Sequence, residues 1–500
     1  MGRPRNQRTA GGGVLLQKGL IFSLGHGLGF VESSLKLLPP WTNGGQEFFL
    51  ELTCFSRIIS GILSEQAREE LLTFSAARNC PTKSWINRLR SINTSSIRPK
   101  HCNQARRTDH LKTNKPSELT LLTSAATSSL SSRPLRRIDL TIKPYMESDD
   151  GIAIWQIAST VIPLILCCIA IGNLTNHLTT ASVVFTPILF ALIVLFLSRS
   201  FSLMHDCGHH SLFRSKVANR IAAFLLSIVH AMPHHPWSRG HAFHHQHNGN
   251  WNRYRGPSAL TTLREYETKN KSSRFTYQLL RHPLTLLPGG FYYLVIKPRV
   301  ALLLGFIELI AKAFADTPRK ISAGQAFNPW LYIKNHKSSF FYTKEEVYDT
   351  IANSICVALA WWWIGSAIGH WHFWILYASI MSVSAAIMIA VFFVQHNFPG
   401  SYASGEEGWS YFKGAIEGSS FLIMPPVLNW FTADIAYHHV HHLSERIPNY
   451  RLRTCHEENR NNFDNVTRLQ LHQLWKCFSL ILWDEDSSQL ASVKAAVPMD

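Results

Sequence analysis

Residues 183–209, VVFTPILFALIVLFLSRSFSLMHDCGH, join a long apolar segment directly to two histidines that lie four positions apart. The apolar part, Val183–Leu203, has the length of about 20 residues that a membrane-spanning helix needs. Residues four apart lie on the same face of a helix, so a helix that continues past the apolar part presents His205 and His209 in one direction. The stretch therefore predicts a membrane span that carries paired imidazoles at its end.

Two stretches without charged residues extend this prediction to four spans. No Asp, Glu, Lys or Arg occurs from residue 151 to 198 or from residue 350 to 405. Each stretch is long enough for a hairpin of two spanning helices, and we expect the other three spans at residues 152–171, 351–369 and 374–394. Buried helices in the core of a large soluble protein are the alternative, but runs of this length without charge favour a membrane.

The positive charge of the chain is concentrated outside the expected hairpins. The net charge is +17 at pH 7, and residues 199–349 hold 20 Lys and Arg against 8 Asp and Glu. Because cytoplasmic segments of membrane proteins carry an excess of Lys and Arg, we expect this middle segment and both termini on the cytoplasmic side. The same distribution argues against the nucleic acid partner that the net charge alone would suggest.

The first part of the chain differs in composition from the remainder. Residues 1–134 are basic, rich in Ser, Thr and Asn and without sustained periodicity, which predicts a mostly disordered extension. The next methionine after Met1 is Met146, so a basic tail close to anionic lipid and translation upstream of the true start are both open. Residues 135–500 are expected to form one domain, with an amphipathic helix from Leu469 onward.

Histidines at regular spacing form four groups along this domain. They comprise nine candidate metal ligands: His205, His209, His241, His244, His245, His396, His438, His441 and His442. Both triplets repeat the spacing HxxHH, which places the rings on one face of a helix, and the predicted topology brings all four groups to the cytoplasmic face. Nine imidazoles exceed the four ligands of a structural zinc site, which favours two metal ions. Imidazole suits iron, copper, zinc and nickel alike, and a solvated polar helix face is the alternative for any single group.

Two acidic residues are candidates for orienting these rings. Asp206 adjoins His205, and Asp434 precedes His438 by four residues, where a carboxylate could accept the ring N–H. A capping or solvated role is the alternative for each. Five further histidines fall off the spacing and are not assigned as ligands: His210, His234, His235, His247 and His439.

The segments HDCGH (205–209), HAFHH (241–245) and HHVHH (438–442), with VQHNF (394–398) before the last, resemble the histidine boxes of the membrane fatty acid desaturases. They look most like the omega-6 or delta-12 branch, which adds double bonds towards the methyl end of an acyl chain. The resemblance covers residues 135–460. It implies an all-α integral membrane protein in which two transmembrane hairpins carry a cytoplasmic helical cap. It also implies two iron ions held by the nine histidines, with O2 as co-substrate.

Removing hydrogen from an unactivated methylene needs cofactor chemistry that no acidic or basic side chain supplies. The resemblance implies an O2-dependent oxidoreductase that introduces a cis double bond into a fatty acyl lipid, an acyl-CoA or an acyl-carrier substrate among membrane lipids. The chain contains no HPGG haem-binding motif, no Rossmann glycine motif and no ferredoxin-like cysteine run. A separate electron donor of the ferredoxin or cytochrome b5 type is therefore expected.

The nearest alternative is a hydroxylase of the same superfamily, acting on fatty acids, alkanes or carotenoids, because the two reactions diverge only after the first hydrogen has left. A histidine-rich metal transporter would place polar ligands within its spans, whereas these histidines follow the apolar runs. A soluble di-iron carboxylate enzyme needs Glu-x-x-His motifs, and the chain contains none.

Overall fold

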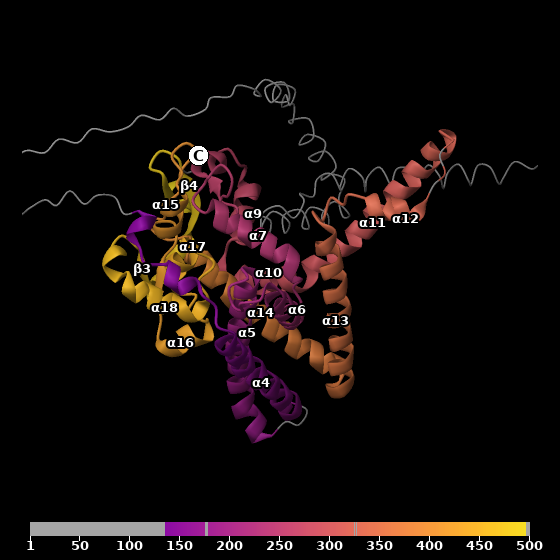
Figure 1. Ribbon diagram of the computed structural model, residues 1–500, viewed down its shortest axis with the longest axis horizontal. Coiled ribbons are helices and arrows are strands. Elements are labelled where there is room, and N and C mark those ends of the chain that lie inside the picture. The colour runs from indigo at the N-terminus through magenta and orange to yellow at the C-terminus, as the bar shows by residue number, and fades with distance from the viewer. Residues whose placement is uncertain (1–135, 176–178, 325, 327, 497–500) are drawn as a thin grey trace, which may run out of the picture. The chain divides into compact units, whose positions relative to one another are not determined.

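The computed structural model describes residues 136–496, except for residues 176–178, 325 and 327. The expected basic extension, residues 1–134, lies outside the described residues. The described part is mainly helical, and long helices extend on one side of a cap that consists mostly of shorter helices (Figure 1).

Four of the described helices are long and apolar enough to cross a membrane: α4 (Asp150–Thr175), α5 (Thr180–Gly208), α13 (Lys344–Ile368) and α14 (His370–Val394). They confirm the four predicted spans, and each helix is longer than the span predicted for it. α4 packs on α5 and α13 packs on α14 as two hairpins, and contacts between α14 and α5 join the hairpins.

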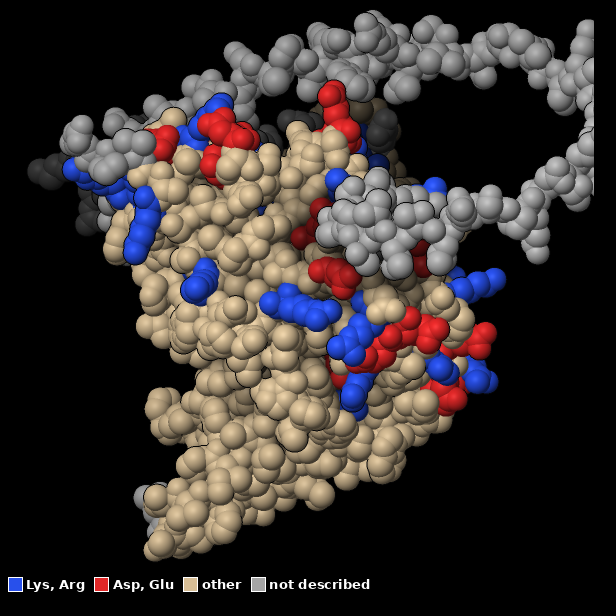
Figure 2. Space-filling model, turned by 90° about the vertical axis from the view of Figure 1, so that its left-hand side faces the viewer, with Lys and Arg blue, Asp and Glu red and all other residues tan. Residues whose placement is uncertain are grey.

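The surface of these long helices is apolar. Trp155 on α4 and Trp363 on α13 are 71% and 70% exposed. On the face shown in Figure 2, the lower part carries no charged side chain, and the Lys, Arg, Asp and Glu residues lie above it. A lipid bilayer would cover such a surface, since its hydrocarbon core excludes charge.

Local sequence explains where the long helices begin and where the second hairpin turns. Thr179 and Thr343 cap α5 and α13, and each side chain accepts a hydrogen bond from a backbone N–H in the first turn. Glu345 and Glu346 add negative charge near the N-terminus of α13, which stabilises that end of the helix. Gly369, with φ of +91°, separates α13 from α14 and supplies a backbone conformation that other residues rarely adopt.

Helices of various lengths form the cap. Those between the two hairpins are α6 (Lys216–Val229), α7 (His234–His247), α8 (Leu263–Glu267), α9 (Lys271–Leu280), α10 (Leu286–Phe291), α11 (Lys297–Ser322) and α12 (Pro329–Asn335). Those after the second hairpin are α15 (Tyr411–Ile416), α16 (Pro426–Phe431), α17 (His438–Leu443), α18 (Asn449–Glu458) and α19 (Leu474–Ser479). Single turns complete it: η1 (Arg137–Asp139), η2 (Lys143–Met146), η3 (Pro283–Thr285), the π-helical η4 (Tyr292–Ile296), η5 (Arg460–Asn462), η6 (Leu471–Gln473) and η7 (Val493–Ala495).

One cap helix, α10, packs closely on the membrane-spanning α14. Gly290 permits this approach, because a Cβ atom at this position would lie 2.7 Å from the Cβ atom of Ala385. The contact places α10 and η4 beside the C-terminal half of α14, which leads to His396.

Two small sheets hold the C-terminal part of the chain against the cap. β1 (Thr261–Thr262), β4 (Leu480–Asp484) and β5 (Gln489–Ser492) pair in the order β1–β4–β5, with β1 parallel and β5 antiparallel to β4. β2 (Phe421–Ile423) pairs in parallel with β3 (Arg468–Gln470). The expected amphipathic helix from Leu469 onward is therefore only partly present: Leu469 belongs to β3, the helical turns η6 and α19 cover residues 471–479, and strands follow from Leu480. The run LILWD, followed by the polar turn EDSS, favours a hairpin because aliphatic and aromatic residues pack well on a sheet surface.

The largest apolar core lies where α5, α6 and α14 meet the cap. It includes Leu203 and Met204 of α5, Ala223 of α6 and Ala385 of α14, all with no exposed surface. His205 follows directly in the sequence and is also fully buried. The histidines thus begin where the apolar core ends.

Candidate metal centre

Four segments bring the nine candidate ligands together. His205 lies in the last turn of α5, and His209 is the residue after this helix, with its backbone N–H donating to the His205 carbonyl at 3.3 Å. The two HxxHH triplets lie on the helices α7 and α17. His396 follows the C-terminal end of α14. The ligand-bearing segments therefore come from both hairpins and from the cap.

These nine histidines form two adjacent clusters. Each histidine contributes one ring nitrogen, and within a cluster these nitrogens all lie within 4.8 Å of one another. The first cluster consists of His205, His209, His241, His245 and His441. The second cluster consists of His244, His396, His438 and His442. Because α7 and α17 contribute to both, the clusters lie side by side: the rings of His245 and His442 stack with their centroids 4.1 Å apart.

Within each cluster, Nε2 atoms approach one another at distances that suit shared coordination. In the first cluster, the Nε2 atom of His241 lies 2.8 Å from that of His205 and 3.0 Å from that of His245. In the second, the Nε2 atoms of His396 and His438 are 2.9 Å apart. Two imidazole nitrogens bound at right angles to one metal ion, at about 2.1 Å each, lie about 3 Å apart. The spacing therefore fits one ion in each cluster.

Burial keeps these rings in the neutral form that binds metals. Burial lowers the pKa well below its usual value, and neighbouring imidazoles lower it further, for His241, His244, His245, His438, His441 and His442. The pKa of His396 falls to about 4, mainly through burial. A neutral imidazole keeps a lone pair on one nitrogen, so these seven rings can each offer a ligand atom at neutral pH.

Several ring nitrogens have no hydrogen-bond partner among the described residues. Both ring nitrogens of His244 and the Nε2 atom of His209 are buried and have no such partner. Leaving a buried polar group unpaired costs about 1–3 kcal/mol, which a bound ligand would offset. Unpaired nitrogens at the centre of two imidazole clusters therefore fit metal ions as the missing partner.

Asp206 lies where its position next to His205 suggests. Its Oδ1 atom is 3.1 Å from the Nδ1 atom of His205, and a ring N–H donated here leaves the Nε2 lone pair directed into the first cluster. Its Oδ2 atom accepts hydrogen bonds from the backbone and side-chain amides of Asn449, at 2.7 and 2.9 Å. Asp206 thus ties the end of α5 to the start of α18.

Two further groups orient ring nitrogens of the clusters, and neither contact was predicted from the sequence. The Oε2 atom of Glu445 lies 3.2 Å from the Nδ1 atom of His209, and the Gly418 carbonyl accepts from the Nδ1 atom of His396 at 2.9 Å. Glu445 lies beyond the end of α17, so helical spacing cannot indicate it, and its only signal is an acidic residue close to a histidine box. A backbone carbonyl leaves no signal in the sequence.

The suggested contact between Asp434 and His438 is absent from the described structure. The Nδ1 atom of His438 is buried without a hydrogen-bond partner among the described residues. Asp434 has a φ of +53° in a turn that precedes α17, so the two residues do not share a helix and the four-residue spacing has no geometric meaning. Burial raises the pKa of Asp434, although the positive charges of Arg453 and Arg199 act against this.

The five histidines that fall off the spacing belong to neither cluster. His439, which lies between ligands on α17, turns away and pairs with His456 through ring nitrogens 2.9 Å apart. The Nδ1 atom of His247 lies 3.0 Å from the Phe243 carbonyl. These contacts give both side chains structural partners outside the clusters.

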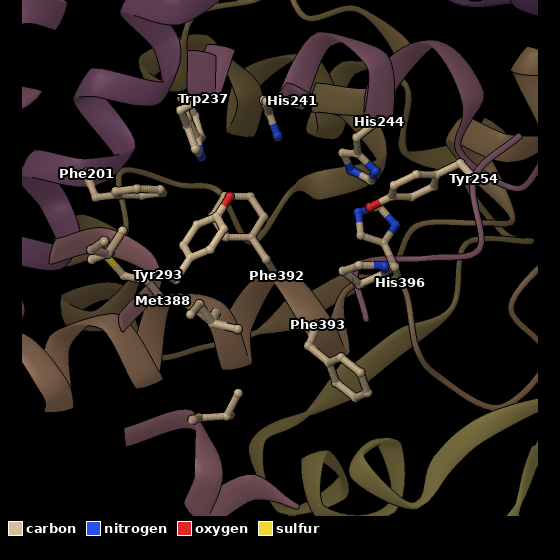
Figure 3. A pocket seen from close by; sticks show the side chains of 14 residues that line it. Phe201, Trp237, His241, His244, Tyr254, Tyr293, Met388, Phe392, Phe393 and His396 are labelled. Atoms are coloured by element: carbon tan, nitrogen blue, oxygen red, sulfur yellow. The ribbon is translucent and has the colours of Figure 1, made fainter. Parts of the chain in front are cut away.

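An apolar cavity of about 120 Å³ adjoins both clusters. His241 of the first cluster and His244 and His396 of the second line it (Figure 3). Much of the remaining wall is aromatic or aliphatic and includes Phe201, Trp237, Met388 and Phe392. Because most of its wall is apolar, the cavity suits a hydrocarbon segment better than a polar ligand.

Comparison with known proteins relates the chain to one family. The family described as fatty acid desaturase matches residues 179–474. A fatty acid desaturase of Bacillus subtilis (strain 168) is 32% identical over 302 residues, which are 60% of this chain and 75% of the relative. An endoplasmic reticulum omega-3 fatty acid desaturase of Nicotiana tabacum is 24% identical over 265 residues, 51% of this chain and 59% of the relative. An sn-1 acyl-lipid omega-3 desaturase (ferredoxin) of Nostoc sp. (strain 36) is 24% identical over 253 residues, which are 50% of this chain and 60% of the relative.

Proposed function

The chain belongs to the fatty acid desaturase family and is an oxidoreductase; from this premise we propose that it uses O2 to introduce a cis double bond into a membrane-associated fatty acyl chain. The observation that carries the proposal is the pair of histidine clusters beside a mainly apolar cavity. The clusters offer ligands for a redox metal, and the cavity offers a place for a saturated segment of the substrate next to it.

We assign one iron ion to each cluster. The five histidines of the first cluster and the four of the second would hold the ions, and the orphaned nitrogens of His209 and His244 support this fit. Imidazole alone does not distinguish iron from copper, zinc or nickel, but oxidation by O2 requires a metal that changes its redox state. When bound, the two irons supply the oxidising power that removes hydrogen from an unactivated methylene.

The residues of the chain hold and orient the reacting groups. Asp206, Glu445 and the Gly418 carbonyl keep three imidazoles in the tautomer whose Nε2 atom faces the metal. The apolar walls of the cavity exclude water and hold the acyl chain beside the clusters. The overall reaction consumes one saturated –CH2–CH2– unit, O2, two electrons and two protons, and yields –CH=CH– and two molecules of water.

The electrons come from a separate carrier in this proposal. The Nostoc relative and plant relatives carry ferredoxin in their names, which supports a donor of the ferredoxin type, and a cytochrome b5 type donor is the alternative. The substrate is an acyl lipid, an acyl-CoA or another acyl carrier. The acyl-lipid desaturases among the relatives favour an acyl lipid as the substrate.

We further propose that the metal centre and both termini lie on the cytoplasmic side, because residues 199–349 between the hairpins are strongly basic. Residues 135–500 would form the catalytic domain. The basic extension 1–134 would be dispensable for catalysis, since the family match begins at residue 179.

A lipid profile of cells that express the full chain tests this function. Fatty acids are analysed by mass spectrometry after derivatisation of the double bonds, with His441→Ala as the inactive control. A new unsaturated acyl chain that is absent from the control is the expected result. A hydroxylated acyl chain would instead show that the protein is a hydroxylase. If residues 135–500 alone give the same lipid profile as the full chain, the extension 1–134 is dispensable for catalysis.

A further inference from the structure

Phe392, in the last turn of α14, lies where the cavity meets both histidine clusters. Its ring centroid is 5.8 Å from that of His205 and 6.0 Å from that of His241 in the first cluster. It is also 5.8 Å from the ring of His438 in the second cluster. Figure 3 shows the Phe392 side chain among those that line the cavity. One aromatic ring thus bounds the space in front of both proposed iron sites.

Three other aromatic side chains of the cavity are placed differently. Trp237 stacks on His241 with the rings 4.9 Å apart and nearly parallel, at an angle of 10°, and lies 5.9 Å from the ring of His205 in the same cluster. The Tyr254 ring lies 4.9 Å from that of His244 in the second cluster. Phe201 packs against Phe392 itself, with the ring centroids 6.1 Å apart. Of these four rings, Phe392 is the one that lies against both clusters.

A saturated acyl chain presents a series of chemically equal methylenes. It offers no hydrogen-bonding group along its length, so beyond the binding of its polar end, the shape of the surrounding wall decides which pair of carbons stands before the metals. Reaction also requires the reacting atoms to be held in close and defined geometry. The side chain nearest to both clusters on the wall is the one with most influence on this alignment.

We propose that Phe392 sets the register of the acyl chain and thereby selects the carbon–carbon bond that becomes double. This inference rests on the proposed function. Phe392 acts here as a specificity-determining residue that touches the substrate, and it takes no part in proton or electron transfer.

Another buried phenylalanine of α14 provides a control. Phe373 is 5% exposed, and its ring stacks on Tyr377 at a centroid distance of 5.3 Å and an angle of 23°. Phe373 is not among the residues that line the cavity, whereas Phe392 is. The substitutions Phe392→Leu and Phe373→Leu remove the same atoms from two positions of one helix, and only the first changes the wall between the clusters.

The first test compares the double-bond positions made by the wild-type chain and by these two variants in the same cells. The expected result is a single positional isomer from the wild type and from Phe373→Leu, and at least one additional isomer from Phe392→Leu. A Phe392→Leu variant that gives the wild-type isomer alone overturns the proposal. So does a folded, iron-loaded variant that gives no product, because loss of register leaves hydrogen removal possible.

A second readout needs neither metal nor turnover. Fatty acids that carry a diazirine at successive carbons are photocrosslinked to the purified metal-free chain, and mass spectrometry identifies which carbons label the α7 peptide that contains Trp237. We expect a narrow set of carbons for the wild type and for Phe373→Leu, and a broader set for Phe392→Leu. Identical sets in all three proteins contradict the proposal. If Phe392→Leu does not accumulate, Phe392→Met replaces it in both tests.

Different outcomes refute the proposed function and the proposed role of Phe392. A wild-type chain that makes no unsaturated product refutes the proposed function. A wild-type chain that desaturates, together with a Phe392 variant of unchanged position and unchanged crosslinking, refutes the register role alone.

Discussion

At the scale of single residues, the orientation of the imidazoles depends on groups that lie behind them. Asp206 and Glu445 each accept from an Nδ1 atom, which leaves the opposite nitrogen for the metal. Partners of this kind fix both the tautomer and the ring plane of a ligand. Their removal therefore lowers metal affinity even though they do not touch the metal.

Asp206 is expected to be required for metal loading. Asp206→Asn weakens the acceptor of His205 and disturbs the two hydrogen bonds from Asn449, and such changes typically reduce metal affinity by about 10–100-fold. Elemental analysis of the purified variants measures the iron bound per chain. Asp434→Asn is the control, because Asp434 makes no hydrogen bond to His438, and we expect it to keep its iron. Equal loss of iron from Asp206→Asn and Asp434→Asn would contradict a specific role of Asp206 in metal binding.

Substitution of Glu445 is expected to lower the iron affinity less than substitution of Asp206. The hydrogen bond from His209 lowers the pKa of Glu445 below its usual value, so this carboxylate stays ionised at neutral pH. Its side chain is 44% exposed, which weakens the contact, and for Glu445→Gln we expect a loss of iron affinity near the lower end of the range, about 10-fold. Competition with an iron chelator measures the affinity, with Glu458→Gln on α18 as the control. A Glu445→Gln protein that resists the chelator as well as the control would exclude this role.

Sequence spacing could indicate the candidate ligands but not their orientation. The HxxHH pattern has a fixed meaning on a helix, and the two triplets do lie on α7 and α17. The same spacing does not relate the candidate Asp434 to His438, because Asp434 lies in the turn that precedes α17. Glu445 and the Gly418 carbonyl reach the rings from non-helical segments, for which spacing has no predictive value.

At the scale of the elements, the cavity depends on the close packing of α10 on α14. Gly290 faces Ala385, and α10, η4 and α14 all contribute residues to the cavity wall. Any group that separates these helices changes the shape of the cavity as well as the stability of the fold.

Gly290→Ala is expected to destabilise the protein. The new Cβ atom would lie 2.7 Å from the Ala385 Cβ and 3.1 Å from its carbonyl carbon, and overpacking of this kind costs about 1–3 kcal/mol. Thermal unfolding in detergent, monitored for wild type and variant, measures the effect. Gly172→Ala on α4 is a matched control, because its Cβ atom would meet Ile368 at an ordinary 3.5 Å. A Gly290→Ala protein as stable as this control would show that α10 can move away from α14 without cost.

The long helices were predictable because charge is absent from their sequences over 48 and 56 consecutive residues. The hairpin of β4 and β5 was not, since its strands are short and the residues from Leu469 onward were interpreted by helical periodicity alone. Its pairing with β1 joins segments more than 200 residues apart, with Thr261 opposite Leu482. Such a contact depends on the tertiary fold and not on the local sequence.

At the scale of the whole molecule, the two hairpins and the cap place the two histidine clusters next to apolar surface. The four long helices expose aromatic and aliphatic side chains, whereas the histidine clusters lie where these helices meet the cap. A substrate that is already dissolved in the membrane can thus approach the clusters without passing through water.

The proposed orientation can be tested with inserted epitopes. An epitope after Gly369, in the link between α13 and α14, is expected on the side opposite to an epitope at the C-terminus, because α14 crosses the membrane between them. Antibody binding to intact and to permeabilised spheroplasts distinguishes the two sides. Detection of the C-terminal epitope in intact spheroplasts would contradict the cytoplasmic assignment.

The two histidine clusters are proposed to hold two iron ions, and the metal content of α17 variants tests this metal centre. Elemental mass spectrometry of the purified full chain is expected to find two irons per chain in the wild type and a reduced content in His441→Ala and His442→Ala. His439→Ala, at the neighbouring position that pairs with His456 outside both clusters, is expected to keep its iron. Equal metal content in all three variants, or a wild-type chain that carries a redox-inactive metal in place of iron, would contradict the account.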